Sequence, residues 1–192
     1  MLAKVKSFAL NGIDGYLVEV EVDIGAGLPK FDIVGLADTA IKESKERVKS
    51  AITNCGLEYP ICRILVNLAP ADTKKESTIY DIAIATAILG AMGQIPYEKL
   101  KDYIFLGELS LDGSVRKING LLPILISARK MGYKNIIIPK QNEVEASYID
   151  GLNIYPVETL TDIFEFFNGN KQLETVELKH FEDIILSSVA NL

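Results

Sequence analysis

Residues 3–23 alternate between apolar and polar positions with a period of two. One face of the segment 16–24 carries Val18, Val20, Val22 and Ile24. The acidic side chains of the same segment fall on the other face, as in a strand of an antiparallel sheet with one solvated side. An alternating segment, 3–10, precedes it across the glycine-containing turn 11–15. The pattern therefore predicts a β-hairpin.

The spacing changes to a helical one in the segment 38–55. Apolar side chains recur there at intervals of three and four residues, Asp38 can cap the first turn, and Gly56 can end the helix.

The polar face of this predicted helix is densely charged. Lys42 lies four residues before Glu46, and Glu43 lies four residues before Arg47. Ion pairs at this spacing each stabilise an exposed helix by about 0.2 to 0.5 kcal/mol. We therefore interpret this face as a solvated helix surface rather than as a binding surface.

The remainder of the chain alternates between short apolar segments and helical ones. Strands are predicted at 31–35, 63–70, 135–139 and 153–158, and helices at 79–92, 121–131, 142–149 and 159–167. Residues 102–118 predict two strands joined at Asp112-Gly113, a dipeptide suited to a type I′ turn. This mixture predicts a single α+β domain, residues 1–169, in which helices pack on a mixed β-sheet. Residues 170–192 are predicted to be a linker or tail.

The composition indicates a soluble, cytoplasmic protein. Hydrophobic residues make up 48% of the 192 residues, which is enough for a sizeable core. The longest apolar run, 82–92, is far shorter than the roughly 20 residues of a bilayer span, and no signal-peptide pattern begins the chain. The net charge of −6 argues against a freestanding nucleic-acid-binding protein with a broad basic face, but not against a local basic groove.

Residues suited to metal or histidine chemistry are scarce. Cys55 and Cys62 lack metal-binding spacing and are expected to be buried thiols. The single histidine, His180, lies in the predicted tail, so neither a multi-histidine zinc site nor a histidine-based triad can form. No Walker A motif occurs in the chain, which argues against a nucleotide site of that kind.

The polar segment 74–78, KKEST, directly precedes the apolar helix at 79–92. A nucleophilic hydroxyl here would need a base, and without a usable histidine that base would be a lysine of lowered pKa. The preferred interpretation is capping, in which oxygens of Glu76, Ser77 and Thr78 accept the first free N–H groups of the helix. Asp81 then suits the helix dipole in the first turn.

Four longer motifs carry a family resemblance. They are FDIVGL at 31–36, KESKERV at 42–48, VNLAPAD at 66–72 and GELSLDG at 107–113. With them the chain resembles the N-terminal domain of the Mg-chelatase-like AAA+ ATPases called YifB or ComM, from Val5 to about Asn170. That domain is similar in fold to the proteolytic domain of Lon, so the resemblance implies a Lon-like fold.

Lon-type proteases use a serine and lysine dyad, and the resemblance implies that this chain lacks both members. Local matching places Ile79 at the serine and Leu122 at the lysine, and neither aliphatic side chain can attack or accept a proton. The family's loop is usually close to KEGS, whereas Ser77 stands here in the glycine place. If that glycine has a positive φ, Ser77 implies local strain.

The resemblance implies a non-catalytic N-terminal domain that provides assembly contacts or guides DNA. The parent would be a cytoplasmic, hexameric ATP-driven DNA motor in natural transformation or recombination. ATP and Mg would bind in an ATPase module beyond this chain, which itself would hold no cofactor or metal. The expected partners are that module, neighbouring subunits and DNA, without a membrane. Candidate DNA contacts are Lys74, Lys75 and Arg116.

Two other functions remain open on the residues alone. One is a Ser-Lys peptidase that uses a shifted hydroxyl, Ser77 or Thr78. It requires a lysine within about 3.2 Å of that hydroxyl. The other is a metal-chelatase accessory subunit, against which the near absence of histidine and of metal-spaced cysteines counts.

Overall fold

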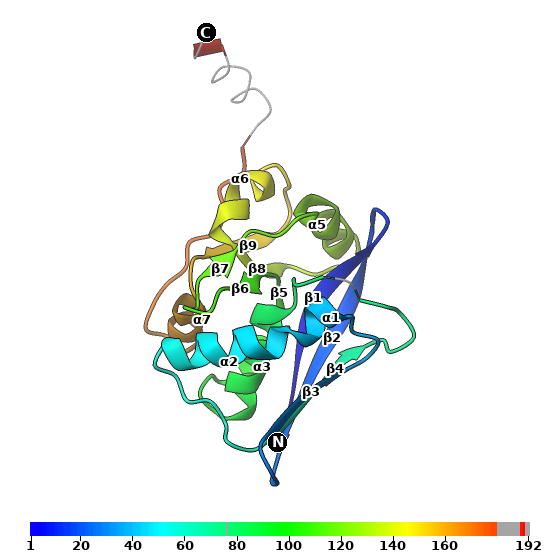
Figure 1. The fold of residues 1–192 in the computed structure, drawn as a ribbon. Helices are drawn as coiled ribbons and strands as arrows, with labels where there is room; N and C mark the ends of the chain where they lie inside the picture. The colour runs from blue at the N-terminus through cyan, green and yellow to red at the C-terminus, as the bar shows by residue number, and fades with distance from the viewer. Residues whose placement is uncertain (76, 180–188, 191–192) are drawn as a thin grey trace.

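A seven-stranded mixed sheet runs through the fold in the computed structural model, which describes residues 1–75, 77–179 and 189–190 (Figure 1). Its strands are β1 (Leu2–Asn11), β2 (Asp14–Gly25), β3 (Lys30–Val34), β4 (Arg63–Ala69), β5 (Tyr103–Phe105), β8 (Asn135–Pro139) and β9 (Asn153–Val157). Their order across the sheet is β3-β4-β2-β1-β5-β8-β9. The pairs β1–β2 and β2–β4 are antiparallel and the other pairs are parallel.

The predicted N-terminal hairpin is confirmed. Strands β1 and β2 pair from Leu2↔Asp23 to Asn11↔Asp14. Val18, Val20 and Val22 are fully buried, as the alternation predicts. The hairpin therefore supplies the apolar surface on which the helices pack.

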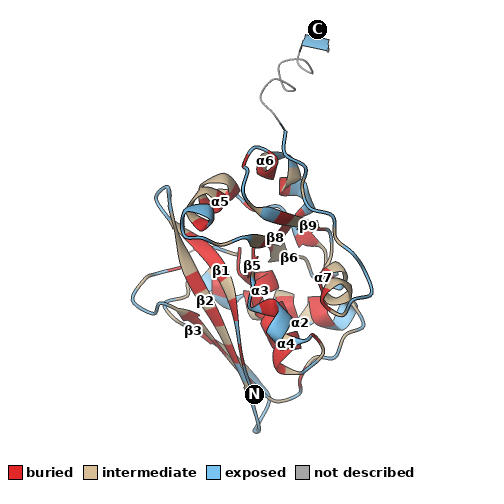
Figure 2. Cartoon of the chain, turned by 180° about the vertical axis from the view of Figure 1, so that it is seen from behind, coloured by how far each residue is buried: buried red, intermediate tan, exposed pale blue. Residues whose placement is uncertain are grey.

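Seven α-helices and one 3-10 helix accompany this sheet in the described residues. They are α1 (Thr39–Lys42), α2 (Ser44–Asn54), α3 (Asp81–Ala91), α4 (Tyr97–Leu100), α5 (Leu121–Lys130), η1 (Lys140–Asn142), α6 (Glu143–Ala146) and α7 (Leu160–Phe167). Helix α3 packs on β1 and β2 and also contacts α2. Because it is covered on all sides, every residue of α3 is buried, which agrees with its apolar sequence (Figure 2).

The predicted helix at 38–55 forms as two helices, α1 and α2. The Asp38 side chain accepts a hydrogen bond from the Ile41 amide at 2.8 Å, as predicted. The chain ends α2 near Cys55, and Gly56 follows with φ of 72°. Cys55 and Cys62 are free thiols that are partly exposed, so their expected full burial is wrong.

The segment 103–118 contains three strands instead of the two predicted. Strand β5 joins the main sheet, while β6 (Glu108–Leu109) and β7 (Val115–Arg116) form a separate small sheet. The pair Leu109↔Val115 leaves five residues between the strands, so the two-residue type I′ turn is wrong. The amide of Gly113 donates instead to the Ser110 carbonyl at 3.0 Å within this longer loop.

The chain stays in contact with the domain beyond Asn170, where a linker or tail was predicted. The Val176 amide donates to the Ile154 carbonyl at 2.8 Å, and the Lys179 amide donates to the Ser147 carbonyl at 2.9 Å. Residues up to Lys179 therefore extend the packed structure. His180 and the predicted weak segment 180–192 lie outside the described residues, apart from Val189 and Ala190.

One hydrophobic core joins the helices to the mixed sheet, which confirms the predicted α+β class. None of the helices in the described ranges combines the length and the apolarity that crossing a bilayer requires.

Candidate functional site

The loop before α3 is held by Lys75. Its backbone amide donates to the Leu36 carbonyl at 3.1 Å, and its own carbonyl accepts from the Asp38 amide at 3.3 Å. The Lys75 ammonium donates to the Gly35 carbonyl at 2.8 Å and to the Pro70 carbonyl. Only 1% of the residue is exposed. Lys75 therefore stabilises the loop, and its expected place on an exposed DNA-contacting surface is wrong.

No described side chain of the segment 74–78 caps α3 itself, but the Thr78 carbonyl accepts from the amide of Asp81, the first residue of the helix, at 3.4 Å. Helix α3 begins at Asp81, and Tyr80 at the N-cap position makes no side-chain cap bond. The amide of Ile82 donates instead to the Gly107 carbonyl at 3.1 Å, and the Gly107 amide donates to the Ile79 carbonyl at 2.9 Å. The chain ahead of β6 thus supplies the acceptor that capping was expected to supply. Glu76 lies outside the described residues.

The hydroxyl of Ser77 makes an expected capping contact with the first residue of the predicted helix, whereas the hydroxyl of Thr78 is engaged elsewhere. Ser77 Oγ accepts from the Ile79 amide at 3.3 Å, and the Thr78 hydroxyl donates to the Glu108 carboxylate. The Lys75 ammonium is bound by the two carbonyls described above, so it is not the base for either hydroxyl. The contact between Thr78 and Glu108 links the loop to strand β6.

An ion pair that the sequence pattern missed lies directly behind this loop. Arg47 contacts Asp81 through Nε and Oδ2 at 2.7 Å and through Nη2 and Oδ1 at 3.1 Å. The Leu109 amide also donates to Asp81 at 3.0 Å. Burial raises the pKa of Asp81 against the opposing pull of Arg47, while the hydrogen bond to Asp81 raises the pKa of Arg47.

This pair replaces two predicted ones. Among the ion pairs of the described residues, neither Lys42 with Glu46 nor Glu43 with Arg47 occurs. Arg47 turns inward because Asp81 is fully buried and needs a charged partner. The only signal of this in the sequence was an aspartate at the start of an otherwise apolar helix.

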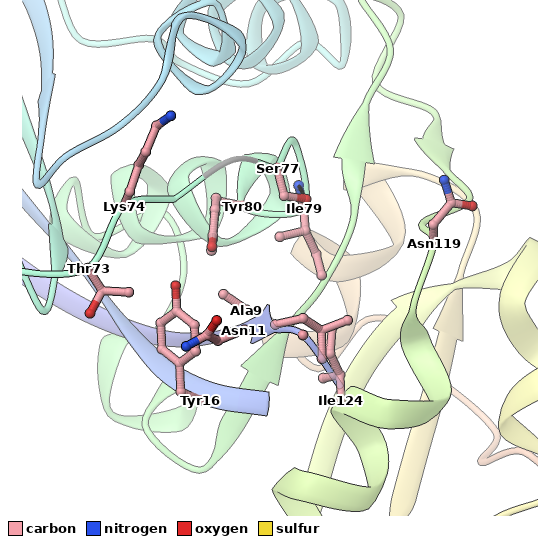
Figure 3. Close-up of a pocket in the computed structure, with 12 residues that line it drawn as sticks. Ala9, Asn11, Tyr16, Thr73, Lys74, Ser77, Ile79, Tyr80, Asn119 and Ile124 are labelled. Atoms are coloured by element: carbon pink, nitrogen blue, oxygen red, sulfur yellow. Dashed lines mark hydrogen bonds between the residues drawn. The ribbon is translucent and has the colours of Figure 1, made fainter. Parts of the chain in front are cut away.

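A cavity of about 560 Å³ lies between the β1–β2 turn, the segment 73–77 and the start of α5. Ile79, at the position expected for the dyad serine, lines this cavity and is only 3% exposed. Figure 3 shows the hydroxyls of Tyr16 and Tyr80 pointing toward one another. The Tyr80 hydroxyl is buried without a hydrogen-bond partner among the described residues, and burial raises the pKa of both tyrosines.

The other dyad position lies apart from this cavity. Leu122 is half-buried in the first turn of α5, and its amide donates to Glu145 at 3.0 Å. It is not among the described residues that line the cavity, whereas Ile124 is. Those described lining residues include amides, hydroxyls, aliphatic groups and Lys74, but no carboxylate, cysteine or histidine.

The two remaining candidate contacts are exposed and lie on different elements. Lys74 lines the cavity from the loop before α3, and in Figure 3 its ammonium points away from Tyr16 and Tyr80. Arg116 lies on β7 and donates through Nε to Ser110 Oγ at 2.6 Å. No group of three His, Cys, Asp or Glu side chains that could hold a metal ion occurs in the described part of the chain.

A comparison with protein families decides the affiliation of this domain. The family described as subunit ChlI of Mg-chelatase matches residues 20–142. The chain belongs to this Mg-chelatase family. Two relatives share its sequence over 90% of the chain. Competence protein ComM of Haemophilus influenzae is 42% identical, and protein YifB of Escherichia coli is 41% identical.

The similarity of this Mg-chelatase family member extends to a protease. Lon protease 1 of Hydrogenovibrio crunogenus is 27% identical over 85% of the chain and 21% of its own length. This supports the Lon-like α+β fold that was expected. The chain spans 34% of the length of ComM and of YifB.

Proposed function

We propose that this chain is the non-catalytic N-terminal domain of a Mg-chelatase-like AAA+ ATPase that acts on DNA. In the assembled protein it provides contacts between subunits and guides DNA. ATP and Mg bind in the ATPase module, and the working form is a cytoplasmic hexamer.

The observation that supports the non-catalytic role is the set of contacts made by the side chains in the loop before α3. Ile79, which the resemblance places at the serine position, is buried and lines the cavity. The neighbouring hydroxyls of Ser77 and Thr78 are bonded to an amide and to a carboxylate, while the Lys75 ammonium is bound by carbonyls. A Ser-Lys dyad needs a lysine as the base for the hydroxyl, and Lys75 has other partners, which supports a loop without Ser-Lys chemistry.

The DNA role is supported by the name of one relative. The Haemophilus influenzae protein is called a competence protein, and this chain is 42% identical to about a third of it. Because the match covers only this part, the motor activity of a longer protein is part of the proposal.

Peptide hydrolysis tests the non-catalytic role. The chain is incubated with an unstructured fluorogenic peptide, beside a Ser77→Ala variant and a Thr78→Ala variant. We expect the same background rate in all three samples and in buffer. Hydrolysis by the wild-type chain that disappears in either variant would establish the peptidase function instead.

Fluorescence anisotropy with a labelled oligonucleotide tests the two exposed contacts that the sequence suggested. We expect the Lys74→Ala/Arg116→Ala variant to bind about two- to tenfold more weakly at low salt, because each lost phosphate contact reduces the electrostatic part of binding. Unchanged affinity would remove both residues from the DNA-contacting surface.

A further inference from the structure

A basic surface lies along the edge of the main sheet, away from the cavity. It is defined by Lys30, Lys42, Lys45, Lys49 and Arg63, which come from β3, α1, α2 and β4. These side chains line two depressions of about 410 and 150 Å³. Because Lys30 and Lys45 line both, the two depressions form one continuous surface.

The charge of this surface is opposite to that of the whole chain. Five cations line it, against the two carboxylates of Asp32 and Glu46 among the described lining residues. The chain as a whole has a net charge of −6. A local excess of three positive charges therefore stands out from an acidic protein, and such a surface attracts polyanions.

Most of these cations are available for a ligand. Within the described residues, Lys42, Lys45 and Arg63 have no carboxylate within ion-pairing distance. In particular, the expected pair of Lys42 with Glu46 does not form. Lys30 has an exposed partner in Asp32 at 3.1 Å. An exposed pair of this kind contributes little to stability, so a phosphate can compete for Lys30.

Two aromatic side chains lie among the lysines. Phe31 and Tyr59 are half-buried and line the smaller depression together with Lys45 and Lys49. The Lys49 ammonium lies 5.8 Å from the centre of the Tyr59 ring. Aromatic faces between cations are the arrangement on which single-stranded nucleic acids bind, with bases stacked and phosphates neutralised.

The strand that carries Lys30 and Phe31 also has an open edge. Strand β3 is at the end of the sheet order and pairs only with β4 among the described strands. Backbone N–H groups on its outer side therefore take no part in strand pairing within the described residues, and phosphate oxygens are common acceptors for backbone N–H groups in protein–DNA contacts.

We propose that this basic surface binds the sugar–phosphate backbone of single-stranded DNA, with bases against Phe31 and Tyr59. The inference rests on the proposed DNA-guiding function and names a further DNA-contacting surface, besides Lys74 and Arg116. The surface is formed only in the fold, because its cations come from segments that lie far apart in the chain.

Anisotropy measurements on the 192-residue chain test this assignment. The probes are a fluorescein-labelled single strand of about 20 nucleotides, the corresponding duplex, and a labelled poly-glutamate peptide. Lys42→Glu/Lys45→Glu reverses two charges on the surface. Lys130→Glu/Lys134→Glu makes the same charge change at exposed positions elsewhere. Circular dichroism verifies that both variants are folded.

We expect Lys42→Glu/Lys45→Glu to weaken single-strand binding at least tenfold, and the control variant to weaken it less than about twofold. If the wild-type chain binds the single strand and the surface variant binds it equally well, the surface assignment is wrong while the proposed function stands. If the wild-type chain binds neither oligonucleotide, the DNA-guiding function fails as well.

The remaining outcomes concern the ligand. Equal affinity for the duplex would overturn the stacking on Phe31 and Tyr59, which needs unpaired bases. Tighter binding of poly-glutamate than of either oligonucleotide, lost in Lys42→Glu/Lys45→Glu, would reassign the surface to an acidic protein partner. A Phe31→Ala variant that loses single-strand affinity but keeps duplex affinity would support the proposal.

Discussion

At the scale of single residues, Lys75 determines the path of the loop before α3. A buried ammonium is costly unless it is fully hydrogen-bonded, and here it is bound by the carbonyls of Gly35 and Pro70. Burial lowers the pKa of Lys75, and the nearby Asp72 carboxylate opposes this. The backbone of Gly35 passes close to Leu68 of β4, and an added Cβ would lie 2.2 Å from the Leu68 carbonyl oxygen. Glycine suits this position for that reason and because its φ is 103°.

Replacing Lys75 with Met tests this structural role. We expect the free energy of unfolding to fall by about 1 to 3 kcal/mol, because the carbonyls of Gly35 and Pro70 lose their charged donor. Urea unfolding measures the change, with Lys74→Met as the control at the neighbouring exposed position. Equal stability of the two variants would show that Lys75 does not hold the loop.

The buried pair of Arg47 with Asp81 is the second residue-scale feature. The Asp81 carboxylate is fully buried and the Arg47 side chain is 18% exposed. Removing Arg47 leaves a carboxylate without its partner in the core. We expect Arg47→Ala to lower the free energy of unfolding by about 3 to 5 kcal/mol, against a small change for Lys49→Ala on the same helix. A loss below about 0.5 kcal/mol in Arg47→Ala would contradict the importance of the pair.

At the scale of elements, the hydrophobic pattern predicted the longer helices and most strands, because buried positions recur along these segments with the period of a helix or a strand. The short helix α4 was not predicted. The pattern failed where the partner is distant in the chain. Arg47 has a suitable glutamate four residues away, yet it pairs with Asp81, 34 residues later. Similarly, the polar segment 74–78 offers capping groups, but Gly107 provides the acceptor for Ile82. Local spacing cannot reveal either partner.

The start of α7 combines a capping box with an ion pair. The Thr159 side chain accepts from the Asp162 amide, and the Asp162 carboxylate accepts from the Thr159 and Glu158 amides. Lys171, from the segment after α7, contacts Asp162 at 2.6 Å. Burial alone would raise the pKa of Asp162, but Lys171 and the two amides together hold it below its usual value.

The Asp162→Ala variant tests this arrangement. We expect a loss of about 1 kcal/mol in the free energy of unfolding at neutral pH. Since the folded-state pKa is lowered, the contribution of Asp162 is present above the unfolded pKa of about 4 and disappears as the pH falls through the folded pKa. Unfolding measured from pH 7 to pH 2 should show the two proteins converging in acid, with Thr161→Ala as a control. A difference in the free energy of unfolding between the two proteins that does not change with pH would contradict a contribution from the ionised Asp162 carboxylate.

At the scale of the whole molecule, the sequence predicted an acidic protein without a broad basic face. In the folded chain, β3, α1 and β4 nevertheless bring Lys30, Lys42 and Arg63 together at one edge of the sheet. Sequence spacing could not show this, since the lysines are spread along the chain. The α+β class was predictable from the pattern, and the Lon-like fold was predictable from motifs that the comparisons support.

The same scale bears on the proposed non-catalytic role. Ile79 lines the cavity beside α3, and Leu122 lies outside its described lining. The basic surface lies on other elements, so the proposed DNA binding does not depend on the residues of this cavity.

The salt dependence of DNA binding by the wild-type chain tests the central claim most directly. Each phosphate neutralised on a single strand contributes about −0.7 to the slope of log association constant against log salt concentration. With three to five cations engaged, we expect a linear decrease with a slope of about −2 to −4. A slope near zero, or no saturable binding at about 50 mM salt, would contradict a DNA-guiding domain.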